Sequence, residues 1–165
     1  MTQEENIAAL ALKLKELALA RRVTVGTAES CTGGLIAGAI TAVPGSSEYF
    51  LGGVVSYANA VKTKLLGVPE EILSTAGAVS GECARFMARG AAKALGADWT
   101  VSVTGVAGPD GGSAEKPIGT VWFGLYGPGG VEAHVRHFAG GRAAVRAQTA
   151  VHALSMLIEA LTEAE

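Results

Sequence analysis

The chain has 165 residues with 13 Lys and Arg against 15 Asp and Glu, and this slightly negative balance lacks the basic excess that nucleic acid binding requires. Hydrophobic residues make up 49% of the chain, yet its continuous apolar runs fall far short of the roughly 18 residues of a membrane-spanning helix. We therefore expect one domain over residues 1–165, with neither a nucleic acid nor a membrane as partner.

Cysteine usage indicates the cellular compartment. Cys31 and Cys83 lie far apart and outside any CxxC pattern, which argues against a zinc site or a disulfide framework. No cationic start followed by an apolar stretch marks a signal peptide, so we expect a cytoplasmic protein. The acidic residues Asp98, Asp110 and Glu115 lack the spacing of metal ligands, and we expect neither a metal nor a cofactor.

The first half of the chain predicts alternating helices and strands. Residues 2–20 carry apolar residues at helical spacing, and Thr2 with Glu5 has the form of a capping box. A β-branched stretch at 23–27 predicts a buried strand, and a helix is predicted over 35–43. A second strand is predicted over 49–57, after which Asn59 is expected to cap a short helix that ends at Gly67.

The second half predicts a longer helix, a third strand and a hairpin. A helical turn at 69–73 precedes a helix over 81–95, which Ser80 is expected to cap. A strand over 99–104 is followed by a long Gly- and Pro-rich loop, a hairpin of 120–126 with 131–138, and a final helix over 142–163. We predict an α/β fold, a layered α-β-α domain with a mixed β-sheet of about five or six strands and helices on both faces.

The stretch AESCTGG, residues 28–34, is predicted to form the turn between the first strand and the following helix. Ligands of open α/β sheets bind at the carboxyl ends of strands, so Ser30 would meet a substrate there. A capping role for Ser30 or Thr32 explains the stretch equally well. Cys31 is a rival nucleophile because a helix N-terminus lowers the pKa of a thiol, although free cysteines are usually buried.

A serine nucleophile needs a base, and Lys62 is the favoured candidate. It falls in the first turn of a predicted helix, where the helix dipole and partial burial both lower the pKa of an amine. Tyr57 could orient that amine or share a proton with Ser30. Lys64 is a rival for the same role, and a solvated surface position is the ordinary condition of either lysine. The three histidines are poor candidates, since two fall on opposite faces of one predicted strand.

Two further features could hold an anion. The stretch TGVAGPDGG, residues 104–112, has glycines that let its backbone approach a ligand, although turn chemistry alone also explains them. Arg142 and Arg146 are spaced to share one face of the last helix, a geometry that suits an anionic group and that surface arginines also show without function.

Several strings resemble a known family. TAESCTGG, VVSYANAVKTKLLGV, TGVAGPDGG and KPIGTVW, in this order, closely resemble the C-terminal domain of the competence/damage-inducible protein CinA. Stand-alone members of that family are nicotinamide-nucleotide amidases, which convert nicotinamide mononucleotide to nicotinate mononucleotide and ammonia. The resemblance implies Ser30 as nucleophile, Tyr57 and Lys62 as its activating partners, and Thr104 with an arginine of the 142/146 pair as ligand contacts.

The sequence thus predicts an amidohydrolase with a serine nucleophile activated by lysine and tyrosine, acting in pyridine nucleotide recycling or in a role tied to DNA uptake. The predicted catalytic residues are Ser30, Tyr57 and Lys62, and the predicted substrate contacts are Cys31, Thr32, Gly33, Gly34, Thr104, Gly105, Gly108, Arg142 and Arg146. N–H groups of residues 31–34 would stabilise the oxyanion. The alternatives are a non-catalytic mononucleotide-binding or regulatory module and a Cys31-dependent amidase. We expect a homo-oligomer with a pyridine mononucleotide as its small-molecule partner.

Overall fold

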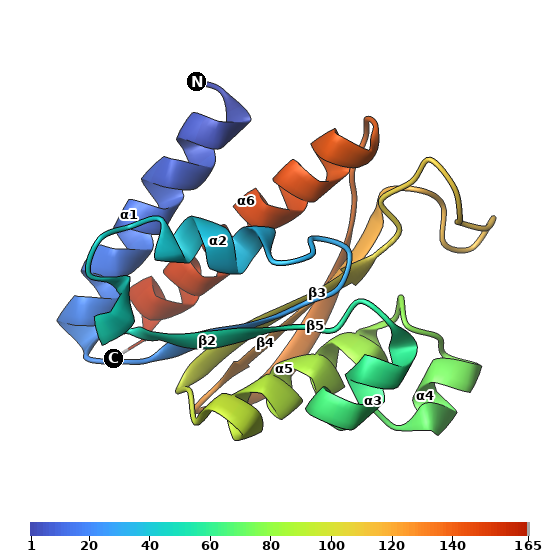
Figure 1. The fold of residues 1–165 in the computed structure, drawn as a ribbon, viewed down its shortest axis with the longest axis horizontal. Helices are drawn as coiled ribbons and strands as arrows, with labels where there is room; N and C mark the ends of the chain where they lie inside the picture. Colours follow the sequence, from blue (N-terminus) through green and yellow to red (C-terminus); the bar gives the residue numbers. More distant parts are fainter. Residues whose placement is uncertain (165) are drawn as a thin grey trace.

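A computed structural model describes residues 1–164 and shows one five-stranded sheet with helices on both faces (Figure 1). The strands are β1 (Val25–Glu29), β2 (Phe50–Val55), β3 (Trp99–Gly105), β4 (Thr120–Gly127) and β5 (Gly130–His137). Their order in the sheet is β2-β1-β3-β4-β5. The first three strands are parallel, whereas β4 and β5 pair antiparallel as a hairpin at one edge. The predicted α/β class with a mixed sheet is confirmed.

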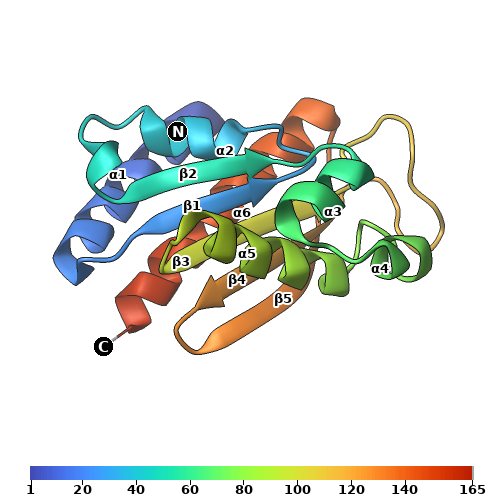
Figure 2. The same ribbon diagram turned by 60° about the horizontal axis from the view of Figure 1, so that its bottom comes forward.

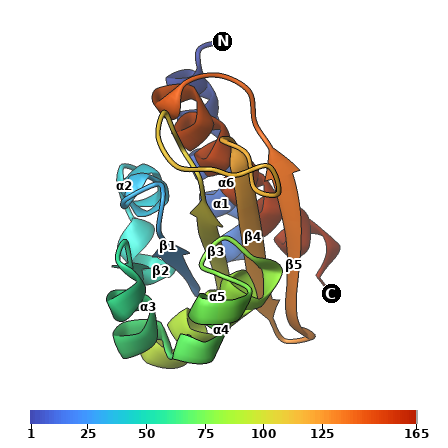
Figure 3. The same ribbon diagram turned by 90° about the vertical axis from the view of Figure 1, so that its right-hand side faces the viewer.

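Within residues 1–164, six α-helices form the two outer layers. They are α1 (Gln3–Arg21), α2 (Leu35–Thr41), α3 (Asn59–Leu66), α4 (Glu70–Thr75), α5 (Gly81–Leu95) and α6 (Arg142–Glu163). Helices α1, α2 and α6 cover one face of the sheet, and α3, α4 and α5 cover the other (Figures 2 and 3). Within the described part of the chain, no helix combines the length and apolar character needed to cross a bilayer.

Several predicted bounds differ by one or two residues from the structure, where the second strand is Phe50–Val55 and the helix after the first strand ends at Thr41, and one predicted cap is absent. The first strand begins and ends two residues later than predicted, because the N–H and hydroxyl of Thr24 bond to the Asp98 carboxylate instead of starting the ladder. Ser30 is therefore the first residue after β1. The predicted cap at Asn59 is wrong, since Asn59 is already helical and the N-cap, Ala58, offers no side-chain hydrogen bond.

The core lies in two apolar clusters, one on each side of the sheet. The larger cluster joins the sheet to α1, α2 and α6, and the smaller joins it to α3 and α5. Gly90 of α5 allows α3 to pack closely, because a Cβ there would overlap the backbone of Leu66. This close packing holds the last turn of α3 against α5.

The carboxyl ends of β1, β2 and β3 lie together at the right-hand side of Figure 1. The beginnings of α2, α3 and α6 and the long loop 106–119 gather at the same end of the molecule. Segments from four distant parts of the sequence therefore meet where parallel strands end, which is the usual ligand position in open α/β sheets.

Candidate active site

Ser30 and Lys62 face each other at the carboxyl end of β1. Ser30 is 8% exposed, and Lys62, from the first turn of α3, is 1% exposed. The Nζ atom of Lys62 lies 2.9 Å from the Oγ atom of Ser30, although the residues are 32 positions apart. An amine within hydrogen-bond distance of a hydroxyl is an arrangement in which a base can take the hydroxyl proton.

The surroundings of the Lys62 amine are uncharged. It donates to the backbone carbonyls of Ser56 and Tyr57, over 2.8 and 3.0 Å. No carboxylate pairs with it within residues 1–164, where the ion pairs join exposed side chains within α1 and within α5. Burial removes water from the amine and thereby lowers the pKa of Lys62 below its usual value of 10.5. The Lys62 amine therefore loses its proton at a lower pH than the amine of a surface lysine does.

The turn that joins β1 to α2 is closed by its own backbone. The N–H of Gly33 donates to the carbonyl of Ser30 over 3.1 Å. Gly34, at φ 106°, is the N-cap of α2, and no side chain of the turn caps the helix in its place. The alternative in which Ser30 or Thr32 serves as the cap is therefore wrong.

Three N–H groups of this turn remain free. Those of Cys31, Thr32 and Gly34 make no hydrogen bond within residues 1–164, whereas the N–H of Gly33 is taken by the carbonyl of Ser30. The expectation that all four residues could donate to an oxyanion is thus wrong for Gly33. Unpaired backbone donors beside a buried hydroxyl suit a ligand oxygen, because such groups are rarely left without a partner.

Glu29, the last residue of β1, is a site residue that sequence reasoning misses. Its side chain is 1% exposed, and its carboxylate accepts from the hydroxyl of Thr32 and from the N–H groups of Ile36 and Ala37, the latter two over 2.9 and 3.0 Å. Both N–H groups belong to the first turn of α2, so Glu29 caps that helix from the preceding strand. A lone acidic residue ending an apolar strand is the signal that could have identified it.

Tyr57 contributes to the lysine environment through its backbone. Its carbonyl accepts from Lys62, whereas its ring is 61% exposed and its hydroxyl accepts from Nη2 of Arg142 over 3.2 Å. The expected contact of the hydroxyl with the amine or with Ser30 is not present, because side chains alternate along the extended segment and Ser56 takes the inward position.

The two arginines of α6 bind different backbone segments. Arg142 donates through Nη1 to the carbonyl of Gly108 over 2.9 Å, at the edge of the site. Arg146 donates through Nε and Nη2 to the carbonyls of Cys31 and Thr32, over 3.1 and 2.9 Å. Arg142 is thus available at the opening of the site, while Arg146 holds the turn that follows Ser30.

Thr104, near the end of β3, supports the opposite wall. Its hydroxyl donates to the carbonyl of Ala78 over 2.8 Å, and its oxygen can still accept a hydrogen bond. Lys116 of the long loop donates to the neighbouring carbonyl of Ala76. The segment between α4 and α5 is therefore fixed to the sheet and to the loop by side chains.

A pocket of about 190 Å³ opens between these groups. Its lining residues are Ser30, Cys31, Tyr57, Asn59, Lys62, Ala78, Val79, Thr104, Gly105, Ala107 and Arg142. The other predicted contacts, Thr32, Gly33, Gly34, Gly108 and Arg146, lie in the supporting turns and helix instead of the lining. Because pockets for whole ligands span roughly 300–1,000 Å³, this one suits the reacting end of a larger molecule.

Cys31 is a poor nucleophile in this setting. It is 6% exposed, and burial raises the pKa of its thiol to about 11. The thiolate is the reactive form of cysteine, so a thiol that stays protonated at neutral pH is inert. The geometry therefore favours Ser30 over Cys31.

The histidines that pair in the structure lie away from this pocket. His134 of β5 and His152 of α6 approach to 2.7 Å between their Nε2 atoms and pack around Phe123. Burial, followed by the facing imidazole of His134, lowers the pKa of His152 to about 4. Neither ring can serve Ser30.

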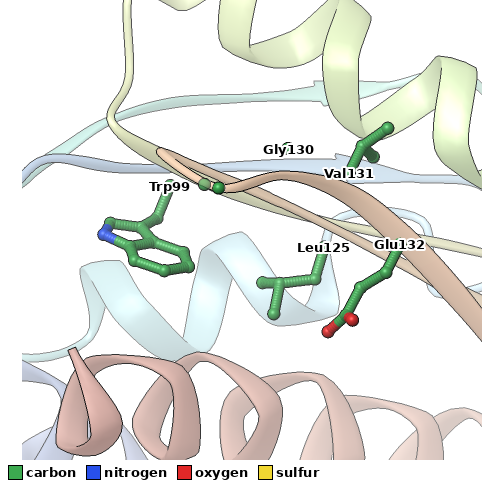
Figure 4. Close-up of a pocket in the computed structure, with 7 residues that line it drawn as sticks. Trp99, Leu125, Gly130, Val131 and Glu132 are labelled. Carbon is green, nitrogen blue, oxygen red and sulfur yellow. The ribbon is translucent and has the colours of Figure 1, made fainter.

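A second hollow lies at the opposite end of the sheet, beside the turn between β4 and β5. Trp99, Leu125 and Glu132 line this pocket of about 270 Å³, with their side chains on one side of the strands (Figure 4). It contains no pairing of a nucleophile with a base. Within residues 1–164, no group of three His, Cys, Asp or Glu side chains could hold a metal ion.

Relatives of known name match the chain over most of its length. A protein from Pseudomonas putida, named nicotinamide-nucleotide amidohydrolase PncC, is 52% identical over 160 residues, which cover 96% of this chain and 99% of that protein. A putative competence-damage inducible protein from Symbiobacterium thermophilum is 55% identical over 146 residues, and a CinA-like protein from Geobacter metallireducens is 53% identical over 135. The chain spans only about a third of the length of these last two relatives.

Solved structures share the whole fold. The competence/damage inducible protein CihA from Agrobacterium tumefaciens has a TM-score of 0.91 at 46% identity, covering 96% of each chain. The competence damage-inducible protein A from Klebsiella pneumoniae has a TM-score of 0.93 at 35% identity, covering 96% of this chain and 99% of that one. A family model described as the CinA C-terminal domain matches residues 7–161. The chain belongs to the CinA C-terminal domain family.

Proposed function

We propose that this protein is a nicotinamide-nucleotide amidase that hydrolyses nicotinamide mononucleotide to nicotinate mononucleotide and ammonia. The observation that carries the proposal is the buried amine of Lys62, 2.9 Å from the hydroxyl of Ser30 in a pocket open to solvent. Likeness to the Pseudomonas putida relative, whose name states this activity, supports the substrate.

Acylation begins at Ser30. Two carbonyls accept the N–H groups of the neutral Lys62 amine, which leaves its lone pair directed at the serine hydroxyl. The Oγ atom attacks the carboxamide carbon while Lys62 takes the hydroxyl proton. When the tetrahedral intermediate collapses, the carbon–nitrogen bond breaks, the lysine returns the proton to the leaving nitrogen, and ammonia departs.

The free N–H groups of the nucleophile turn would hold the oxyanion. Those of Cys31, Thr32 and Gly34 have no acceptor within the described residues. Fixed donors are most effective where charge develops in the transition state, and loss of one donor typically costs about 2.7–4 kcal/mol of barrier. Of these three residues, Cys31 also lines the pocket, whereas Thr32 and Gly34 lie in the supporting turn.

Deacylation uses the same amine. A water molecule takes the place that ammonia leaves, and Lys62 removes its proton as the water oxygen attacks the acyl carbon. The bond between Oγ and the acyl carbon breaks, and the proton returns to Ser30. The product is nicotinate mononucleotide, whose new carboxylate carries the water oxygen.

The rest of the substrate would extend from the pocket toward Arg142. This exposed guanidinium keeps N–H groups free beyond its bonds to Gly108 and Tyr57, and the 5′-phosphate is an acceptor that suits them. The oxygen of Thr104 can accept from the carboxamide N–H₂ at the inner end. In this assignment Arg142, and not Arg146, contacts the phosphate.

Ammonia release from nicotinamide mononucleotide tests the proposal. We expect turnover by the wild type, a loss of about 10²–10⁴-fold in Ser30→Ala and in Lys62→Ala, and no change in the matched control Lys64→Ala, whose side chain is exposed on the same helix. Binding of the mononucleotide without ammonia release would instead identify a non-catalytic binding module. Undiminished activity in both site variants would exclude the mechanism.

We further propose that residues 1–165 form one amidase domain and that this domain acts as a homo-oligomer. The edge strand β2 supports self-association because it carries the exposed apolar residues Leu51 and Val55. Both cysteines are free, which is the usual condition in the reducing cytoplasm. Light scattering of the purified protein gives the mass that tests self-association.

A further inference from the structure

The carboxylate of Glu29 is buried directly beside the nucleophile, yet the amide chemistry does not use it. All its donors, the hydroxyl of Thr32 and the N–H groups of Ile36 and Ala37, come from the segment that follows Ser30. All three groups donate, so the side chain acts as an acceptor-only carboxylate. No cation pairs with it within residues 1–164.

Capping α2 does not account for a buried charge. A helix cap adds little stability, whereas taking a carboxylate out of water carries a much larger penalty before its hydrogen bonds offset it. A short polar side chain at the N-cap is the usual way to satisfy the first turn, but Gly34 occupies that position. The Glu29 carboxylate also accepts from the hydroxyl of Thr32, a contact that lies outside the helix cap.

Thr32 is held from two directions. Its hydroxyl donates to Glu29, while its carbonyl and that of Cys31 accept from Arg146 on the other side of the turn. Because a peptide group is planar and trans, fixing the carbonyl of Cys31 toward Arg146 directs the N–H of Thr32 the opposite way. Arg146 thus sets the direction of the free N–H of Thr32, and Glu29 holds the side chain of the same residue.

We infer that Glu29 is a positioning residue of the active site, which, through Thr32 and the first turn of α2, fixes the N–H groups that receive the oxyanion. This inference rests on the proposed amidase function. The Glu29 side chain touches neither substrate nor Lys62. The Lys62 amine donates to the carbonyl of Ser56, and the N–H of Ser56 donates over 2.8 Å to the backbone carbonyl of Glu29, which every side chain at position 29 leaves in place.

Two variants separate this role from plain stability. Glu29→Gln keeps the shape but places an N–H₂ group against the N–H of Ile36 or of Ala37, and Thr32→Val removes the donating hydroxyl without changing the size of the side chain. We expect kcat to fall by about 10²–10³-fold in both, the loss typical of a displaced oxyanion donor. We expect KM within a few-fold of the wild type and an unmoved acid limb of the pH–rate profile, because Lys62 keeps its contacts.

Conservative and distant replacements serve as controls. Thr32→Ser retains the hydroxyl and should recover most of kcat, and Glu48→Gln neutralises an exposed carboxylate outside the site and should leave it unchanged. Folded Glu29→Gln and Thr32→Val proteins with wild-type kcat would overturn the inference. So would a loss in Thr32→Ser as large as in Thr32→Val, or a shift of the acid limb in place of a lower kcat.

Labelling of Ser30 by a fluorophosphonate distinguishes failure of this inference from failure of the proposed function. The reagent phosphonylates an activated serine and needs no nicotinamide. If the wild type releases no ammonia, the amidase proposal fails, and the labelling rates still decide on Glu29. We expect labelling at least tenfold slower in Glu29→Gln and Thr32→Val than in the wild type, and equal rates would overturn the positioning role.

Discussion

Replacing Lys62 with methionine removes the amine and keeps the apolar stem of the side chain. Activity should fall by about 10²–10⁴-fold, because Ser30 loses its base. Stability should change far less, since two opposing effects act. The carbonyls of Ser56 and Tyr57 lose a donor, at about 1–3 kcal/mol each, while a desolvated cation that costs several kcal/mol is removed.

The pH dependence of that stability difference follows from the lowered pKa of Lys62. Between this lowered pKa and 10.5, the unfolded chain keeps a proton that the folded protein has released, so wild-type stability rises with pH across the window. Below the window both states are protonated and the folded protein carries the full penalty of burying the charge. Each unit of lowering corresponds to about 1.4 kcal/mol.

Urea unfolding at pH 7 and pH 10 measures this difference. The wild type should gain stability relative to Lys62→Met as the pH rises, whereas Lys64→Met, on the exposed side of α3, should track the wild type at both pH values. A difference between wild type and Lys62→Met that does not change with pH would refute the lowered pKa, and with it the neutral amine that the mechanism needs.

Three further predictions address other groups. Arg142→Gln should raise KM for nicotinamide mononucleotide by about 10–100-fold, the worth of a charge-assisted hydrogen bond, with a smaller effect on kcat; an unchanged KM would remove Arg142 from phosphate binding. Cys31→Ala should retain activity, and iodoacetamide should inactivate the wild type only slowly at neutral pH, because the thiol pKa is about 11; rapid inactivation would revive the thiol mechanism. The free energy of unfolding should fall as the pH drops from 6.5 toward 4, because the unfolded chain protonates His152 while the folded chain resists; a pH-independent value in this range would contradict the lowered pKa.

The proximity of Ser30 and Lys62 could be predicted from the sequence, because it depends on the order of the parallel strands and on the turn signals that follow them. The turn after β1 and the turn into α3 follow two parallel neighbours, and the carboxyl ends of parallel strands lie at one edge of a sheet. Alternating patterns and glycine-rich turns mark both places in the sequence. The carbonyls of Ser56 and Tyr57 hold the Lys62 amine in place, and Gly90 allows the far end of α3 to pack closely on α5.

Side-chain direction was harder to predict. Arg142 and Arg146 are one helical turn apart, and a rise of about 6 Å is enough for one to reach the pocket opening and the other the nucleophile turn. Tyr57 turns outward because Ser56 takes the inward position of an extended segment, a choice that no short pattern encodes.

Partners distant in sequence or hidden within a motif were also missed. Glu29 lies within the stretch that identified Ser30, but its role as a cap shows only when the first turn of α2 folds back over it. The contact of His134 with His152 joins β5 to α6, and helical or strand periodicity carries no information about such a pair.

A double-mutant cycle on Ser30 and Lys62 tests the central claim most directly. Ammonia release would be measured for the wild type, Ser30→Ala, Lys62→Ala and the double variant under identical conditions. If the two residues act as one unit, the double variant should be about as slow as either single variant, since each alone already abolishes nucleophilic attack. Losses that multiply in the double variant would show independent roles and contradict the account.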